Sequence, residues 1–221
     1  DANTGLGYGA LSDNTTADNN TAVGYFALLR NTTGTSNVAL GKDSLKENTT
    51  GASNTAVGAL SLDACTTGNS NVAVGINSLT STQTGSNSVA VGNGALSSQL
   101  GSGNMFNVAI GPDAGAAITT GTQNTLIGSL AGDAITTGNN NTALGYTSLT
   151  ANTTGEDNIA IGALAIADNT TGSNNVGIGR EALEKNTTAS NNTGIGHQAL
   201  AVNTTGTGNT AVGKGALDAN T

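Results

Sequence analysis

Hydrophobic and polar positions along this chain repeat with a fixed, short period. In each repeat an Asn, a β-branched residue, a small residue and an aliphatic residue precede a glycine. This glycine defines position 0, and successive glycines are 17 apart in the numbering, except for Gly92 and Gly111, which are 19 apart. A fixed short period predicts one structural unit stacked many times. The thirteen glycines are Gly7, Gly24, Gly41, Gly58, Gly75, Gly92, Gly111, Gly128, Gly145, Gly162, Gly179, Gly196 and Gly213.

The run before each glycine predicts a β-strand. Position −3 is Thr, Val or Ile in every repeat, position −2 is small except at Leu126, and position −1 is always Leu, Val or Ile. Short runs of β-branched and aliphatic residues that end at glycine are typical of strands. A helix is disfavoured because a glycine and an Asn/Thr/Gly cluster interrupt every repeat.

The rest of the repeat predicts turns. Position +4 is usually Leu, and positions +7 to +10 read Asn-Thr-Thr-Gly at 31–34 and 152–155. The second glycine, sometimes replaced by Ala, is typical of a turn with positive φ. Each repeat is therefore expected to hold two short strand-like segments and two turns, as one coil of a parallel β-solenoid or β-roll. We predict one all-β repeat domain over 1–221, an excerpt of a longer fibre, with a bulged coil at 93–111 that is longer than the others.

Charges and substitutions predict which positions face inward. The 20 charged residues occupy only positions +1, +2, +5, +6, +11 and +12, so the other positions are expected inside the coil or against an uncharged surface. Two repeats replace Leu at +4 by Gly115 and Gly132 and gain Ile118 and Ile135 at +7. Positions +4 and +7 should therefore share one space. The usual Asn at +7 would then form an inward hydrogen-bonded ladder.

The composition limits the kinds of partner that the chain is expected to bind. The net charge of −8 disfavours binding to nucleic acid, which needs clustered Lys and Arg, and binding to anionic lipid. No apolar run approaches the roughly 20 residues that span a bilayer, so no membrane contact is expected for this segment. Each coil has only two or three sizeable aliphatic side chains, so its hydrophobic core is thin. Burial of this core must offset the cost of ordering the backbone, about 1–2 kcal/mol per residue. We therefore expect the chain to associate with further copies of itself.

Four strand runs resemble a known family. The runs at 37–41, 88–92, 107–111 and 158–162 read NVALG, SVAVG, NVAIG and NIAIG, similar to the S/N-V-A-I-G repeat in YadA-like heads of trimeric autotransporter adhesins. The resemblance implies a left-handed β-roll, a homotrimer and display on a bacterial outer surface, where the head attaches to host or environmental surfaces. The family's usual head repeat is shorter, which leaves a phage tail fibre or spike, or another extracellular filament, as alternatives.

Few residues are candidates for a catalytic, metal-binding or ligand-binding role. His197 has no partner at ligand spacing, Cys65 lacks a neighbouring base, and no recurring carboxylate pair suits glycoside cleavage. We expect no catalytic residue, no metal, no cofactor and no enzyme activity. Tyr8, Tyr25 and Tyr146 occupy position +1, and Phe26 occupies +2. These aromatic residues form the candidate ligand-contact ridge, because exposed rings stack on sugars and anchor protein contacts.

An ice-binding solenoid is a further alternative. The Thr-Thr pairs at 15–16, 32–33 and 49–50 would stack into regular rows on an uncharged face. Adjacent strand residues point to opposite faces, so each pair should present only one outward Thr. The rows also break in the bulged coil. We therefore rank this function below a surface fibre.

Overall fold

The computed structural model describes residues 2–220, which contain strands and turns but no helix. The chain comprises two compact units, Asp1–Asn107 and Val108–Thr221. Within each unit the chain winds into a parallel β-solenoid with one coil for each sequence repeat, which confirms the predicted fold class. The single domain over 1–221 stays a prediction.

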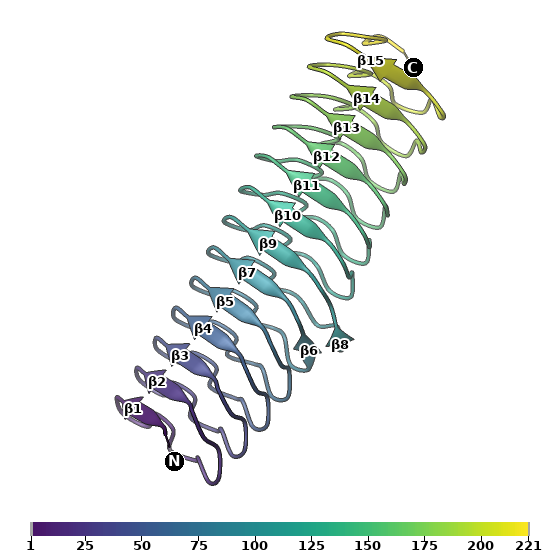
Figure 1. Ribbon diagram of the computed structural model, residues 1–221. Helices are drawn as coiled ribbons and strands as arrows, with labels where there is room; N and C mark the ends of the chain where they lie inside the picture. Colours follow the sequence, from purple (N-terminus) through teal and green to yellow (C-terminus); the bar gives the residue numbers. More distant parts are fainter. Residues whose placement is uncertain (1, 221) are drawn as a thin grey trace. The chain divides into compact units, whose positions relative to one another are not determined.

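In the first unit each coil contributes one short strand to the main sheet (Figure 1). Neighbouring strands pair in parallel and oppose equal positions of the repeat, as with Val38 opposite Thr55. This register holds because a shift by one residue would turn every inward side chain outward. The strands are β1 (Thr4–Leu6), β2 (Thr21–Val23), β3 (Val38–Leu40), β4 (Thr55–Val57), β5 (Val72–Val74) and β7 (Val89–Val91).

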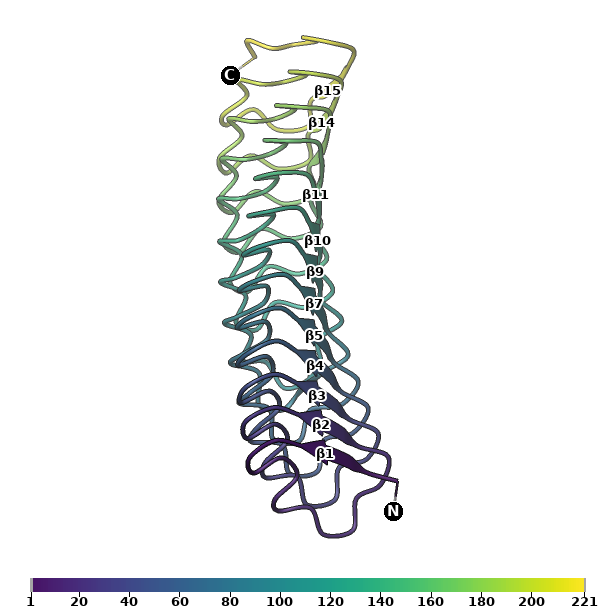
Figure 2. The same cartoon turned by 90° about the vertical axis from the view of Figure 1, so that its left-hand side faces the viewer.

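The second unit repeats the same arrangement (Figure 2). Its strands also pair in parallel without a register shift, as with Ala143 opposite Ala160. They are β9 (Val108–Ile110), β10 (Thr125–Ile127), β11 (Thr142–Leu144), β12 (Ile159–Ile161), β13 (Val176–Ile178), β14 (Thr193–Ile195) and β15 (Thr210–Val212).

From β2 onward, each three-residue strand points its middle residue inward. Ala39, Ala73 and Ala160 at position −2 are fully buried, whereas the residues at −3 and −1 are exposed or half-buried. The alternation follows from the two-residue period of a strand. The inward residue is small because the opposite side of the coil already supplies the buried Leu at +4, such as Leu45.

Positions +4 and +7 share one interior space, as predicted. Ile118 and Ile135 are fully buried at +7. A Cβ added to Gly132 at +4 would lie 2.8 Å from Ile135 Cδ1 and 2.8 Å from Leu126 Cδ2. The missing Leu side chain is thus replaced by the Ile, and in this coil also by Leu126. Close packing inside proteins makes such paired substitutions necessary.

We expect Ile118→Asn to lower the free energy of unfolding by about 2–4 kcal/mol, because the space beside Gly115 would lose its large aliphatic side chain. Chemical denaturation followed by circular dichroism measures this. The double variant Gly115→Leu with Ile118→Asn recreates the Leu/Asn pair of other coils and should recover most of the loss. A single variant as stable as the parent would contradict the shared space.

Asparagines form a ladder at −4 in each unit and a shorter ladder at +7, which covers Asn14–Asn48 in the first unit and Asn152–Asn220 in the second. At +7, the amide of Asn48 donates to Asn31 Oδ1 (2.7 Å) and to the carbonyl of Gly51 (3.0 Å). At −4, the backbone N–H of Asn54 donates to Asn37 Oδ1 (2.9 Å), and its side-chain amide donates to the carbonyl of Gly68 (2.8 Å). The +7 ladder confirms the prediction.

Two expectations about the turns are wrong. The ordinary coil contains one strand, because residues at +2 and +4 adopt left-handed φ, as in Asp43 (54°) and Leu45 (49°), and cannot extend. The second glycine, at +10, does not have positive φ. It leaves space instead, since a Cβ on Gly34 would lie against the carbonyl oxygen of Gly51 in the next coil and 2.6 Å from Asn31 Oδ1, although Ala17 and Ala189 occupy this position in two other coils.

The longer coil at 93–111 differs from its neighbours in the first unit. It contributes β8 (Gly103–Asn104), which pairs in parallel with β6 (Gly85–Ser86), away from β5 and β7 (Figure 1). Gln99 takes the +7 position and reaches the −4 column, where its amide donates to Ser88 Oγ (3.2 Å). Gln99, whose side chain is longer than the usual Asn at +7, therefore occurs together with Ser88, the single residue at −4 that is not Asn.

Candidate functional site

The outer surface of each unit divides into sides of different chemistry. The strand face consists of the outward side chains at −3 and −1, all of them Thr, Val, Ile or Leu. The charged side chains lie on the turns that follow positions 0, +4 and +10. The strand face is uncharged, as is the Thr corner at +8 and +9, and half-exposed apolar residues such as Leu40 (45%) and Leu144 (45%) lie on the strand face.

Three residues of the predicted ridge meet in the first unit. Tyr8 and Tyr25 stack with ring centroids 5.5 Å apart and planes at 15°. Phe26 lies 4.1 Å from Tyr25 and 5.5 Å from Tyr8 between centroids. The parallel register produces this cluster, because equal positions in successive coils are brought about 4.8 Å apart. We call Tyr8, Tyr25 and Phe26 the aromatic cluster.

Tyr146 is not part of this cluster. It lies in the second unit with 60% of its surface exposed. Among residues 2–220 no aromatic ring packs against it. The predicted ridge is therefore a cluster of three rings plus one isolated ring.

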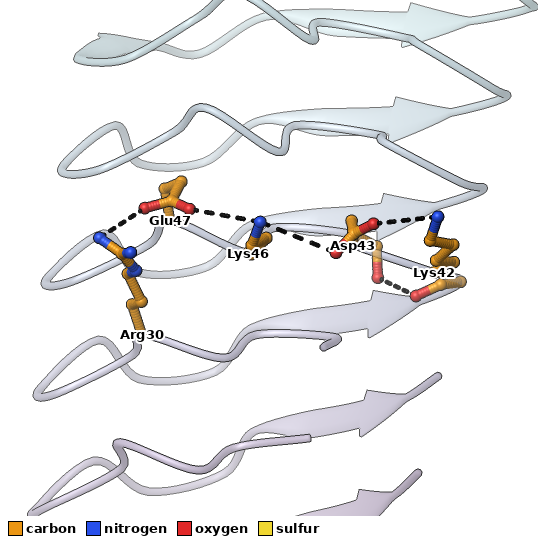
Figure 3. A network of polar contacts seen from close by, with 7 residues as sticks. Arg30, Lys42, Asp43, Lys46 and Glu47 are labelled. Atoms are coloured by element: carbon orange, nitrogen blue, oxygen red, sulfur yellow. Dashed lines mark hydrogen bonds and ion pairs between the residues drawn. The ribbon is translucent and has the colours of Figure 1, made fainter. Parts of the chain in front are cut away.

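A chain of ion pairs, drawn in Figure 3, lies near Phe26 of the aromatic cluster. Arg30 pairs with Glu47 at 3.0 Å, and Lys46 lies between Glu47 (3.8 Å) and Asp43 (3.9 Å). Lys42 pairs with Asp43 at 3.7 Å and keeps 68% of its side chain exposed. Lys46 Nζ also lies 6.0 Å from the Phe26 centroid, within reach of a cation–π interaction. This group was not predicted from the sequence, although Arg30, Lys42 and Lys46 lie close together along the chain.

Cys65 and His197 are placed apart from this group. Cys65 takes the +7 position inside the coil, fully buried, and burial raises the pKa of its thiol to about 11 although the Gly68 backbone lowers it. The neutral thiol is therefore the form at physiological pH. Because Cys65 replaces an Asn, the buried Asn48 Oδ1 has no hydrogen-bond partner in the described chain. His197 lies half-buried at +1.

The Thr-Thr pairs form a corner and not a strand. Thr32 is half-buried and Thr33 is exposed, because bends replace the alternation of a strand here. From the second coil onward, each such pair still presents one exposed Thr, at +9, beside a half-buried Thr at +8, although the pair lies in a bend and not in a strand. The Thr32 hydroxyl donates to the carbonyl of Thr49 (2.9 Å), and further hydroxyls at +8 do the same. Hydroxyls at +8 thus join coils.

None of three comparisons, with protein-family models, with curated proteins and with solved structures, finds a match to this chain. Within residues 2–220, no three His, Cys, Asp or Glu side chains gather closely enough to hold a metal ion. The same part of the chain contains no helix that is long and apolar enough to cross a membrane.

Proposed function

We propose that this chain is a segment of an extracellular attachment fibre, built like the YadA-like heads of trimeric autotransporter adhesins from three chains that meet through their strand faces. The observation that carries the proposal is the strand face itself. Its side chains are uncharged in every coil, and position −1 is always aliphatic. Aliphatic side chains that stay exposed or half-buried at −1 in coil after coil are typical of a protein–protein interface.

The distribution of charge supports the same arrangement. The turns of the coils carry all of the 20 charged residues, so three strand faces could approach without burying an unpaired charge. The turn surfaces would remain outside, with their net negative charge keeping the fibre soluble. On a bacterial outer surface or a phage virion, this outward surface is the part that would contact a host or environmental surface.

The mass of the full chain in solution tests the proposal. We expect light scattering to give three times the chain mass of 21.3 kDa. The double variant Leu40→Lys with Leu144→Lys, one change on the strand face of each unit, should convert the trimer to monomers, since burying an unpaired ammonium group costs several kcal/mol.

The matched control is Thr50→Lys with Thr154→Lys, which adds the same charges at exposed corner positions of the same coils. This variant should remain a trimer. A parent chain that is a folded monomer would overturn the proposal. Thermal hysteresis in such a monomer would favour the ice-binding alternative instead.

A further inference from the structure

Aromatic and basic residues are concentrated in the first three coils. Three of the five aromatic residues and three of the six basic residues lie within 8–46. In a chain of near-identical coils, such a local departure distinguishes one part of the surface from the others. The six residues are Tyr8, Tyr25, Phe26, Arg30, Lys42 and Lys46.

The rings are held in place by their neighbours. Phe26 packs where Gly9 has no side chain, since a Cβ on Gly9 would lie 2.6 Å from Phe26 Cδ1. Tyr25 has Tyr8 and Phe26 as ring neighbours and still exposes 47% of its surface. A half-exposed ring that is already ordered loses little conformational entropy when a ligand stacks on it.

The exposed ammonium of Lys42 is the charged group beside the rings that an anion would meet. In the ion-pair network Arg30, Lys42 and Lys46 face the two carboxylates of Asp43 and Glu47 (Figure 3), and the three coils also contain Asp13 and Asp18. The chain as a whole has a net charge of −8. Lys42 is the exposed end of this network, and within residues 2–220 its ion-pair contact is to Asp43 at 3.7 Å.

We propose that Tyr25, Phe26, Lys42 and Lys46 form a binding patch for an acidic polysaccharide, one whose sugar rings carry carboxylates. The apolar C–H face of a sugar ring stacks on the exposed tyrosine, as aromatic side chains allow. The sugar carboxylate pairs with the Lys42 ammonium, which lies on the coil next to Tyr25, as the hydrogen bond from the Asp43 N–H to the Tyr25 carbonyl shows (2.9 Å). This inference rests on the attachment function proposed above and names its ligand class.

Titration calorimetry of the full chain with polygalacturonate tests the patch, with the methyl-esterified polymer as the uncharged match. We expect binding of the acidic polymer, weakened by added salt because the pairing is electrostatic, and at least about tenfold weaker binding of the ester. Tyr25→Ala and Lys42→Gln should each weaken binding about threefold to tenfold, as for loss of one stacking or ionic contact of about 1 kcal/mol.

Tyr146→Ala and Lys214→Gln are the matched controls, because both residues occupy position +1 in the second unit. They should bind like the parent. The proposal is overturned if neither polymer binds, if the ester binds equally well, or if the Tyr146 and Tyr25 variants lose binding equally. Circular dichroism confirms that each variant is folded. If the chain is a trimer that does not bind polygalacturonate, the binding patch is wrong and the fibre proposal stands. If the chain is a monomer that binds polygalacturonate, the fibre proposal is wrong and the binding patch stands.

Discussion

Gly75→Ala should lower the free energy of unfolding by about 3 kcal/mol or more, the largest effect we expect from adding one methyl group. Gly75 has a φ of +135°, which L-residues rarely adopt, and its added Cβ would lie 2.6 Å from the carbonyl carbon of Gly92 in the next coil. The methyl group must therefore strain the backbone and push two coils apart, and each of these effects costs about 1–3 kcal/mol. Urea denaturation followed by circular dichroism measures the change.

Gly103→Ala separates the two causes. Gly103 also has a positive φ (+75°), but an added Cβ there would meet no atom within 4 Å. It should cost only the backbone strain, about 1 kcal/mol. Equal losses at Gly75 and Gly103 would show that contact between coils does not make the glycine necessary.

Asn54→Asp should cost about 3 kcal/mol or more, although it changes only an amide into a carboxyl group. The Asn54 amide donates to the carbonyl of Gly68 (2.8 Å) and to Asn37 Oδ1 (3.2 Å), and its Oδ1 accepts from Asn71. An ionised carboxylate would place a buried negative charge against two acceptors that have lost their donor. Chemical denaturation at several pH values measures the effect.

The loss should depend on pH. Burial would raise the pKa of the new carboxyl group above the usual value of about 3.9. The protonated form then stabilises the folded state, so the variant should be closest to the parent below about pH 4 and lose stability as the pH rises through the raised pKa. Asn19→Asp, the same change at an exposed position, should be nearly neutral. A loss at Asn54 that stays constant with pH would contradict the buried ladder.

The positions that face the interior could be predicted from the sequence because two patterns of residue use indicated them. Charges never occupy the interior positions, and Gly115 and Gly132 lose a Leu where Ile118 and Ile135 supply an aliphatic side chain. Both signals arise because charge and volume are strongly restricted in a packed interior. The ladder at −4 was also visible as Asn in all but one repeat, although its hydrogen bonds were not inferred.

The turns could not be predicted in the same way. Leu at +4 gives no sign of its left-handed φ, since Leu rarely adopts it and only the closure of the coil imposes it. The glycine at +10 suggested a positive φ, yet Gly34 has none, and its missing Cβ leaves room for the Gly51 carbonyl of the next coil and for the Asn31 side chain. Uncharged positions were also ambiguous, because an interior and an outward strand face exclude charge alike.

By itself the sequence determined the coil, its period, the position of the strand and the shared space at +4 and +7, because these depend on residues within one repeat or at equal positions of the next. Only the tertiary structure decided what the coils present to the outside. Stacking in parallel register made the sides at −3 and −1 an uncharged face, brought Tyr8 and Tyr25 together and placed Lys46 beside Phe26. These contacts depend on the path of the backbone between coils, which no single repeat encodes.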